Sequence, residues 1–584
     1  MRRLLILAWI LWGVVSGAAA RPSDDGNFIR VVVPERDTTV IAARFQRFNA
    51  STLPGSKVTI NGETFKVWPT GAFAGYLPLK PGINRLEIVS EHPGKGIVRK
   101  VVVVESRLPV AEKTTERFSI ERAETVPAEP LWLQTGDLLQ VRMKAFPGCR
   151  AYFLNGQPMQ ELPSSQTGGI AGIYQGMYRI NPGDTLRNEP VPFTLVGGNG
   201  EKTTAASAGR VSLNAREFPA VGVTTGTFPY FSYGLGEDRL GGARISYLDT
   251  GVVLPLSGRT GNLYRVNLGS SRQVFIPSEL VRVLPTGTFP PQSLTGSWTV
   301  TGDDRQDYLR IGLSQKLPYI TRYESHPSRI VVELFGATSN TNWITQLNSA
   351  REIGDVWHEQ PETGVMRITI GLKHPRAWGY RVYYERNTLV VMVKRPPATG
   401  GLQGLTIGLD AGHGGPNNGA LGSTGAKEKE INLAVVMKLK AALEREGARV
   451  ILTRKGDENI NNTDRWLIWQ QADPHLALSI HCNSIGNSDP LRTQGVSTYY
   501  KYVAFRTLSA ILYEELLQTG LEEFGNIGSF NFLLNAPTQF PNALLELAFM
   551  SHPEDEMKLL DPAFQDKIVT AVVAGLEKYM AGIN

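Results

Sequence analysis

Four side chains in the last third of the chain have the types and the spacing of a hydrolytic metal site. Two are histidines and two are glutamates, and each lies near a short apolar segment: His413, Glu428, His481 and Glu546. Two imidazoles and one carboxylate suit Zn²⁺ and leave a fourth position open for water. The remaining carboxylate suits a general base and acid. The chain has no His-Glu-x-x-His helix, so it does not have that protease site.

The segment around His413 is the starting point for this interpretation. A short apolar run, 405–409, leads directly into D-A-G-H-G-G at 410–415. Glycines on both sides of the histidine leave a bare backbone, so a bulky group can approach the imidazole closely. The alternative is a tight turn that happens to contain a histidine.

The surrounding periodicity predicts an α/β domain. Apolar residues recur at helical spacing from 430 to 447, while 449–453, 476–480 and 543–545 read as buried strands. Strands that alternate with helices favour a mostly parallel sheet with helices on both faces. Sites in such sheets collect outside the carboxyl ends of the strands, where all four side chains can meet.

Each of these residues also has an ordinary interpretation. A single histidine at a strand end is usually a satisfied polar residue, and Glu428 stands in a K-E-K-E run typical of a solvated surface. Glu546 differs because it lies between Leu545 and Leu547, where a buried carboxylate is costly unless it is paired or near a metal. His475 and His552 are spare candidates that follow strands less cleanly.

Five motifs occur in order within residues 405–580: D-A-G-H-G-G (410–415), E-K-E-I-N-L (428–433), T-R (453–454), S-I-H-C-N (479–483) and A-L-L-E (543–546). Together they resemble the zinc-dependent N-acetylmuramoyl-L-alanine amidases of the Amidase_3 type. The resemblance implies that His413, Glu428 and His481 are zinc ligands and that Glu546 is the catalytic carboxylate. It also implies cleavage of the amide between the lactyl group of N-acetylmuramic acid and L-alanine of the stem peptide.

Two features differ from the pattern of that family. Relatives often have Phe-x-Ser-Asn after the catalytic glutamate, where this chain has F-M-S-H at 549–552. Some relatives carry a long helical insert that blocks the zinc until a protein activator binds. The connection from Asn483 to Gly495 is short, so we expect no such device there.

The N-terminus predicts export. Residues 1–20 combine a basic start, a short apolar core and a small-residue exit, which is typical of a secretory signal peptide. No cysteine lies directly after the cleavage region, so we expect no lipid anchor there, and no later segment is apolar enough to cross a bilayer. We therefore expect an exported protein of the periplasm or extracellular envelope that is not an integral membrane protein. Cys149 and Cys482 fall in different predicted domains, which favours two free thiols over a disulfide.

Charge divides the chain into two parts. The formal net charge is +6, and residues from 402 onward carry 15 Lys and Arg against 21 Asp and Glu, so the preceding part carries +12. A basic exported surface is suited to an anionic polymer of the cell wall, and the alternative is a solvated face with no partner. The chain shows no nucleic-acid motif, so nucleic acid is not an expected partner.

The region before residue 400 is predicted to be all β. A Pro-Gly…Asn-Gly layout at 54–62 recurs at 147–156, an offset of 93 residues, which indicates two related Ig-like modules at 27–107 and 108–212. Residues 213–287 resemble a bacterial SH3-like barrel. Residues 295–396 contain a second duplication and resemble the AMIN module that targets some exported amidases to peptidoglycan. A Pro- and Gly-rich linker at 397–403 then leads to the catalytic domain at 404–584.

The sequence therefore predicts a multidomain, exported peptidoglycan hydrolase with Zn²⁺ as its cofactor and peptidoglycan as its partner. Two alternatives stay open. One is a non-catalytic wall-binding protein with a decayed amidase fold, and the other is a zinc peptidase that acts on the stem peptides.

Overall fold

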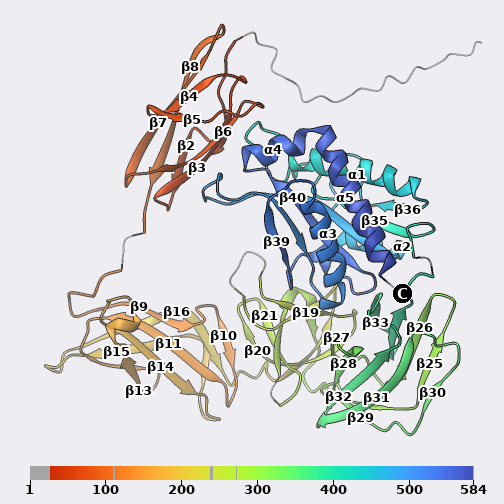
Figure 1. The fold of residues 1–584 in the computed structure, drawn as a ribbon. Helices are drawn as coiled ribbons and strands as arrows, with labels where there is room; N and C mark the ends of the chain where they lie inside the picture. Colours follow the sequence, from red (N-terminus) through yellow and green to blue (C-terminus); the bar gives the residue numbers. More distant parts are fainter. Residues whose placement is uncertain (1–25, 110–111, 237–240, 271, 399, 583–584) are drawn as a thin grey trace, which may run out of the picture. The chain divides into compact units, whose positions relative to one another are not determined.

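The computed structural model describes residues 26–109, 112–236, 241–270, 272–398 and 400–582. A mostly β region precedes a C-terminal α/β domain (Figure 1). The described chain divides into two compact units, the first made of residues up to 108 with the segments 422–425 and 486–491, and the second of the remainder. The predicted signal peptide, 1–20, lies outside the described residues.

The N-terminal β region of the first unit contains two sheets around one apolar core. One sheet has the strand order β1 (Arg30–Val33), β3 (Phe45–Ser51), β6 (Ala72–Pro78). The other has the order β2 (Thr38–Ile41), β8 (Gly96–Ser106), β7 (Gly82–His92), β4 (Lys57–Ile60), β5 (Glu63–Phe65). Phe48 and Phe73 from the first sheet pack in the same buried cluster as Val102 from the second.

The predicted second module contains β9 (Ile120–Val126), β10 (Leu131–Leu133), β11 (Leu138–Ala145), β12 (Arg150–Phe153), β13 (Gln157–Glu161), β14 (Ile173–Arg179), β15 (Leu186–Val196) and β16 (Lys202–Leu213). In both this module and the first one, a glycine packs so closely against a backbone carbonyl oxygen that no side chain would fit. A Cβ on Gly71 would lie 2.0 Å from the carbonyl oxygen of Thr52, and one on Gly172 would lie 2.0 Å from that of Ala145. Thr52 and Ala145 are 93 positions apart, which equals the offset of the predicted repeat.

The predicted third module is joined to the second by strand pairing. It contains β17 (Ala220–Thr224), β18 (Tyr230–Ser232), β19 (Arg244–Tyr247), β20 (Val253–Thr260), β21 (Leu263–Asn267), β22 (Gln273–Pro277) and β23 (Val281–Val283). Strand β10 pairs with β16 on one side and with β20 on the other. The hydrogen-bonded ladder therefore continues across the predicted boundary at 212.

The segment before the catalytic domain has three sheets: β24 (Ser293–Thr295) with β29 (Ala337–Ser339); β30 (Ile344–Gln346), β25 (Trp298–Gly302), β26 (Gln306–Gly312), β34 (Thr388–Lys394), β33 (Tyr380–Glu385); and β27 (Tyr319–Ser325), β28 (Ser328–Phe335), β32 (Val365–Leu372), β31 (Ile353–Glu362). Its buried residues form one cluster with those of the preceding module, including Leu254 and Leu309.

The C-terminal domain is built on a six-stranded sheet with the order β36 (Arg449–Leu452), β35 (Thr406–Ala411), β37 (Leu476–Asn483), β40 (Asn542–Phe549), β38 (Val496–Tyr499), β39 (Glu523–Ile527). Strand β38 runs antiparallel to β40, and the other pairs are parallel. The helices are α1 (Glu428–Arg445), α2 (Asn462–Ala472), α3 (Arg506–Leu517), α4 (Pro553–Leu560) and α5 (Pro562–Ala581).

The two faces of this sheet are covered by different helices. Leu476 and Leu478 of β37 pack in the large core with α1, α3 and α5, whereas Ala477 packs with Trp466 and Trp469 of α2. Side chains alternate between the faces of a strand, so this split follows from the sequence of β37. The near-continuous apolar composition of the strand reflects burial on both faces.

The predicted linker does not separate the catalytic domain from the segment before it. Trp378 is 4% exposed and belongs to the core of the catalytic domain, where its ring stacks on Tyr579 at a centroid distance of 5.6 Å. The backbone N–H of Tyr380 also donates to the carbonyl oxygen of Thr538 at 2.8 Å.

Among the described residues, no helix is long and apolar enough to span a membrane. Cys149 and Cys482 are both free thiols, the first half-buried and the second buried.

Candidate metal centre

His413 lies in a tight loop two residues beyond the end of β35 at Ala411. Its φ of 63° falls in the left-handed region, which is uncommon for a residue other than glycine and is found at strained functional sites. The glycine before it is required by space, because a Cβ on Gly412 would lie 2.2 Å from the ring of His481. The two imidazoles meet edge to face with a centroid distance of 4.9 Å.

A buried carboxylate anchors the end of the same strand. Asp410 is fully buried, accepts hydrogen bonds from Thr453 and Ser479, and pairs with Arg465 Nη1 at 2.5 Å. Burial raises the pKa of Asp410, but the charge of Arg465 and these hydrogen bonds outweigh it and hold that pKa below its usual range.

Two buried arginines bind the backbone of the His413 loop. Arg465 Nη2 donates to the carbonyl oxygen of His413 at 2.6 Å, and Arg454 Nε donates to that of Ala411 at 2.7 Å. Arg454 Nη2 also donates to the carbonyl oxygens of Gly412 and Lys429. Arg454 thereby joins the loop to the first turn of α1.

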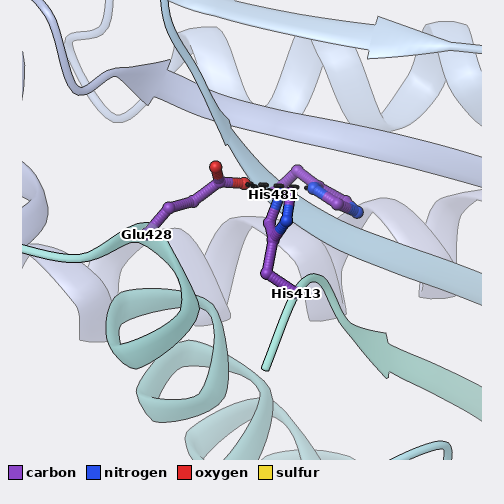
Figure 2. Close-up of side chains that lie close together, drawn as sticks. All are labelled: His413, Glu428 and His481. Carbon is purple, nitrogen blue, oxygen red and sulfur yellow. Dashed lines mark hydrogen bonds and ion pairs between the residues drawn. The ribbon is translucent and has the colours of Figure 1, made fainter. Parts of the chain in front are cut away.

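Glu428 is the first residue of α1, so the helix begins two residues earlier than the expected start at 430. A carboxylate in the first turn is stabilised by the partial positive charge of the helix N-terminus. Glu428 Oε1 lies 3.1 Å from His413 Nε2 and 3.0 Å from His481 Nδ1. The backbone N–H of Ala420 donates to Oε2 at 2.7 Å. Figure 2 shows the carboxylate directed at both imidazoles.

The pKa values of Glu428 and His413 are both shifted in this centre. Burial raises the pKa of Glu428, but its hydrogen bonds with His413 and His481 outweigh burial and hold that pKa far below its usual range. Burial lowers the pKa of His413, and its contacts with Glu428 and Asn417 more than compensate and raise it. The centre therefore keeps Glu428 ionised.

These residues fit a zinc ion. One ligand atom each from His413, Glu428 and His481 can be chosen so that all lie within 4.8 Å of one another. Ligand atoms about 2.0 Å from a tetrahedral Zn²⁺ lie about 3.3 Å apart, close to the separations of Glu428 Oε1 from the two nitrogens. His413 Nδ1 lies 3.1 Å from Asn417 Oδ1, a partner that holds the ring with Nε2 towards the site.

Glu546 is a neighbour of this group but does not belong to it. It lies inside β40, not at the expected strand end, because the apolar strand continues to Phe549. It is 8% exposed and is the direct cross-strand partner of His481 on β37 and of Ser497 on β38. In-register residues on neighbouring strands share a face, so the side chains of Glu546 and His481 project from the same face of the sheet.

The two spare candidates, His475 and His552, are not part of the group formed by His413, Glu428 and His481. The Nδ1 atom of His475 accepts a hydrogen bond from the backbone N–H of Thr406 at 2.8 Å, before β37 begins. His552 is buried and is the N-cap residue of α4. Residues 484–495 contain no helix.

Sequence reasoning assigned no role to the residues that hold the ligands in place: Asp410, Asn417, Asn432, Arg454 and Arg465. Asn432 Nδ2 donates to Glu428 Oε1 at 3.2 Å, four residues along the same helix. One available signal was a charge next to an apolar segment, as in Asp410 after 405–409 and Arg454 after 450–452. Arg465 gave the same signal, because it directly precedes the apolar segment 466–469.

The C-terminal domain is similar in sequence to known cell wall amidases. Among curated proteins, the probable cell wall amidase LytH of Staphylococcus epidermidis is 32% identical over 182 residues, which is 31% of this chain and 60% of that protein. LytH of Staphylococcus aureus matches with the same identity and coverage. The chain therefore spans less than two thirds of the length of these relatives.

Two solved structures are also similar to this segment. The catalytic domain of CwlV, an N-acetylmuramoyl-L-alanine amidase from Bacillus (Paenibacillus) polymyxa var. colistinus, is 29% identical over 31% of this chain and 99% of that chain, with a TM-score of 0.29. The amidase AmiC2 of Nostoc punctiforme is 29% identical over 30% and 97%, also with a TM-score of 0.29. The model of the N-acetylmuramoyl-L-alanine amidase family matches residues 407–578, and this segment is a domain of that family.

Proposed function

We propose that this protein is an exported, zinc-dependent N-acetylmuramoyl-L-alanine amidase that releases stem peptides from peptidoglycan. The observation that carries the proposal is the convergence of His413 Nε2 and His481 Nδ1 on one carboxylate oxygen of Glu428. The same domain matches the amidase family, and LytH is described as a probable cell wall amidase. Residues 1–20, with their signal-peptide pattern, support export.

In this proposal His413, Glu428 and His481 hold the metal. A zinc ion bound there would supply a water molecule of lowered pKa and polarise the scissile carbonyl. The carboxylate of Glu546 accepts the proton of the attacking water. As the bond between the lactyl carbonyl carbon and the alanine nitrogen breaks, Glu546 passes that proton to the nitrogen. The lactyl group stays on the glycan as a carboxylate, and the stem peptide leaves with a protonated amino group that carries both protons of the water.

The backbone of the site keeps the ligands in position before substrate binds. Arg465 and Arg454 fix the carbonyl groups on both sides of the His413 loop, and Asp410 fixes Arg465. Substrate-independent positioning of this kind lowers the entropic cost of reaching the reactive geometry.

The upstream region has a proposed architecture of its own: Ig-like modules at 27–107 and 108–212, an SH3-like barrel at 213–287 and an AMIN-like domain at 295–396. We infer that this basic region binds wall material, because the residues before 402 carry a formal charge of +12, or +10 once Arg2 and Arg3 are removed with the signal peptide. A protein activator is not part of the proposal.

Analysis of reaction products tests the proposed activity. Purified peptidoglycan is incubated with the full chain, and the soluble products are identified by mass spectrometry, with Glu546→Gln as the control. An amidase releases intact stem peptides that begin with L-alanine. Stem peptides that are shortened or still attached to the glycan would indicate a zinc peptidase, and the absence of any product would indicate a non-catalytic wall-binding protein.

A further inference from the structure

A groove of about 540 Å³ lies on the outward face of the predicted second module, far along the chain from the metal centre. The face is formed by β9, β11, β14 and β13, which follow one another in the sheet (Figure 1). The residues that line the groove include three glutamines, one arginine and two exposed apolar side chains: Gln140, Gln160, Gln175, Arg142, Val126 and Met177.

Strand register places these side chains beside one another. Gln140 on β11 is the direct partner of Met177 on β14, and Arg142 is the partner of Gln175. Gln175 is in turn the partner of Gln160 on β13. Because these positions alternate with core residues along each strand, all five side chains are on the outward face.

The polar groups of this groove are available to a ligand. All three glutamines are exposed, and no group in the described part of the chain hydrogen-bonds their side chains. Arg142 is half-buried, and its Nε atom is covered without a hydrogen-bond partner among the described residues, so only the part of the guanidinium beyond Nε can reach a ligand. The nearest carboxylate by register, on Glu124, pairs instead with Arg122 Nε at 3.5 Å.

The groove also offers apolar surface. Met177 is 64% exposed and Val126 is 45% exposed. Exposed apolar groups among orienting polar groups are typical of a binding site.

We propose that this groove binds glycan strands that carry free lactyl carboxylates. Each glutamine amide offers both donors and acceptors, which match the hydroxyl and N-acetyl groups of an amino-sugar chain. Met177 and Val126 contact the apolar C–H faces of the sugar rings. Arg142 supplies the charge-assisted hydrogen bond that a carboxylate accepts and that the glutamines cannot provide.

The choice of ligand rests on the proposed function. Hydrolysis adds water across the amide between lactyl group and alanine, so it converts a neutral amide on the glycan into a carboxylate and releases the peptide amine. A strand that still carries stem peptides has no lactyl carboxylate. The groove therefore retains the protein on strands from which the peptides have been removed.

Binding is measured with the full chain carrying Glu546→Gln, so that the ligand is not altered during the experiment. The ligands are glycan strands whose peptides were removed by an unrelated amidase, and oligomers of N-acetylglucosamine, which have no lactyl group. Arg142→Gln removes the guanidinium, and Arg187→Gln, an exposed arginine on β15 outside the groove, is the matched control. Thermal denaturation of each variant verifies folding.

We expect the peptide-free strands to bind about tenfold more weakly to Arg142→Gln than to the parent, and equally well to Arg187→Gln and the parent. The neutral oligomer of N-acetylglucosamine should bind weakly to the parent and to Arg142→Gln alike. Equal affinity of parent and Arg142→Gln for the peptide-free strands, or equal affinity of the parent for both ligands, would overturn the proposal. Since an unrelated enzyme prepares the ligand, the result is independent of whether this chain is itself an amidase.

Discussion

Arg465 Nη2 donates a 2.6 Å hydrogen bond to the carbonyl oxygen of His413, while Nη1 of the same guanidinium pairs with Asp410. The same Nη1 also donates to the carbonyl oxygen of Ala411 at 2.7 Å, so a single buried side chain from α2 binds the backbone on both sides of the loop that presents a candidate metal ligand. The left-handed conformation of His413 persists because these contacts hold it.

Arg465→Lys should therefore weaken zinc binding. A lysine keeps a positive charge near Asp410 but cannot make the paired contacts of a guanidinium. Loss of such an orienting partner typically lowers metal affinity by about 10–100-fold. Competition with a chromogenic chelator measures the affinity, and an unchanged value in a folded variant would show that Arg465 has only a structural role.

Removal of the metal should abolish hydrolysis of peptidoglycan, and added zinc should restore it. His413→Ala and His481→Ala each remove one imidazole ligand, so both variants should lose zinc and activity together. Metal analysis of the purified protein with a parallel activity assay checks this. Full activity after exhaustive chelation would contradict the proposed centre.

Glu546→Gln should separate metal binding from catalysis. The amide keeps the shape of the side chain but cannot accept a proton from water at neutral pH. The variant should therefore retain zinc while its rate falls by about 10²–10⁴-fold. The roles of the two glutamates would be reversed if Glu546→Gln lost zinc while Glu428→Gln stayed loaded and inactive.

Trp378→Ala should destabilise the catalytic domain by about 3–5 kcal/mol, although Trp378 precedes the predicted linker. The reason is its burial in the core of that domain, against Tyr579. Urea unfolding followed by helical circular dichroism measures the effect, because every described α-helix lies between 428 and 581. Trp343→Ala, at a tryptophan that is 62% exposed, is the control and should change stability by about 0.5 kcal/mol or less.

Lys501 should make the free energy of unfolding rise with pH. Burial, with a smaller contribution from the charge of Arg244, lowers the pKa of Lys501 from 10.5 to about 8. Between these values the unfolded chain binds a proton that the folded chain does not, so raising the pH favours the folded state. Unfolding at pH 8 and pH 10 should show a larger increase for the parent than for Lys501→Met, and equal increases would contradict the shift.

The domain family and the candidate ligands follow from sequence alone. The residue types themselves specify the imidazole and carboxylate groups. The order of the motifs that contain His413, Glu428, His481 and Glu546 is specific for the amidase family. Strand and helix periodicity also predicts the α/β sheet, because alternation and helical spacing are local properties. The expected ends of these elements were less accurate, as α1 and β40 show, because packing decides where an element stops.

Other features depended on the tertiary structure. Asp410 and Arg465 are 55 positions apart, so no local pattern could predict their ion pair or the hold of Arg465 on the His413 loop. The packing of Trp378 into the catalytic core and the continuous ladder through β10 are also contacts between distant segments. Residue chemistry and periodicity are encoded locally, whereas the partners of a buried charge or ring are decided only when the chain packs.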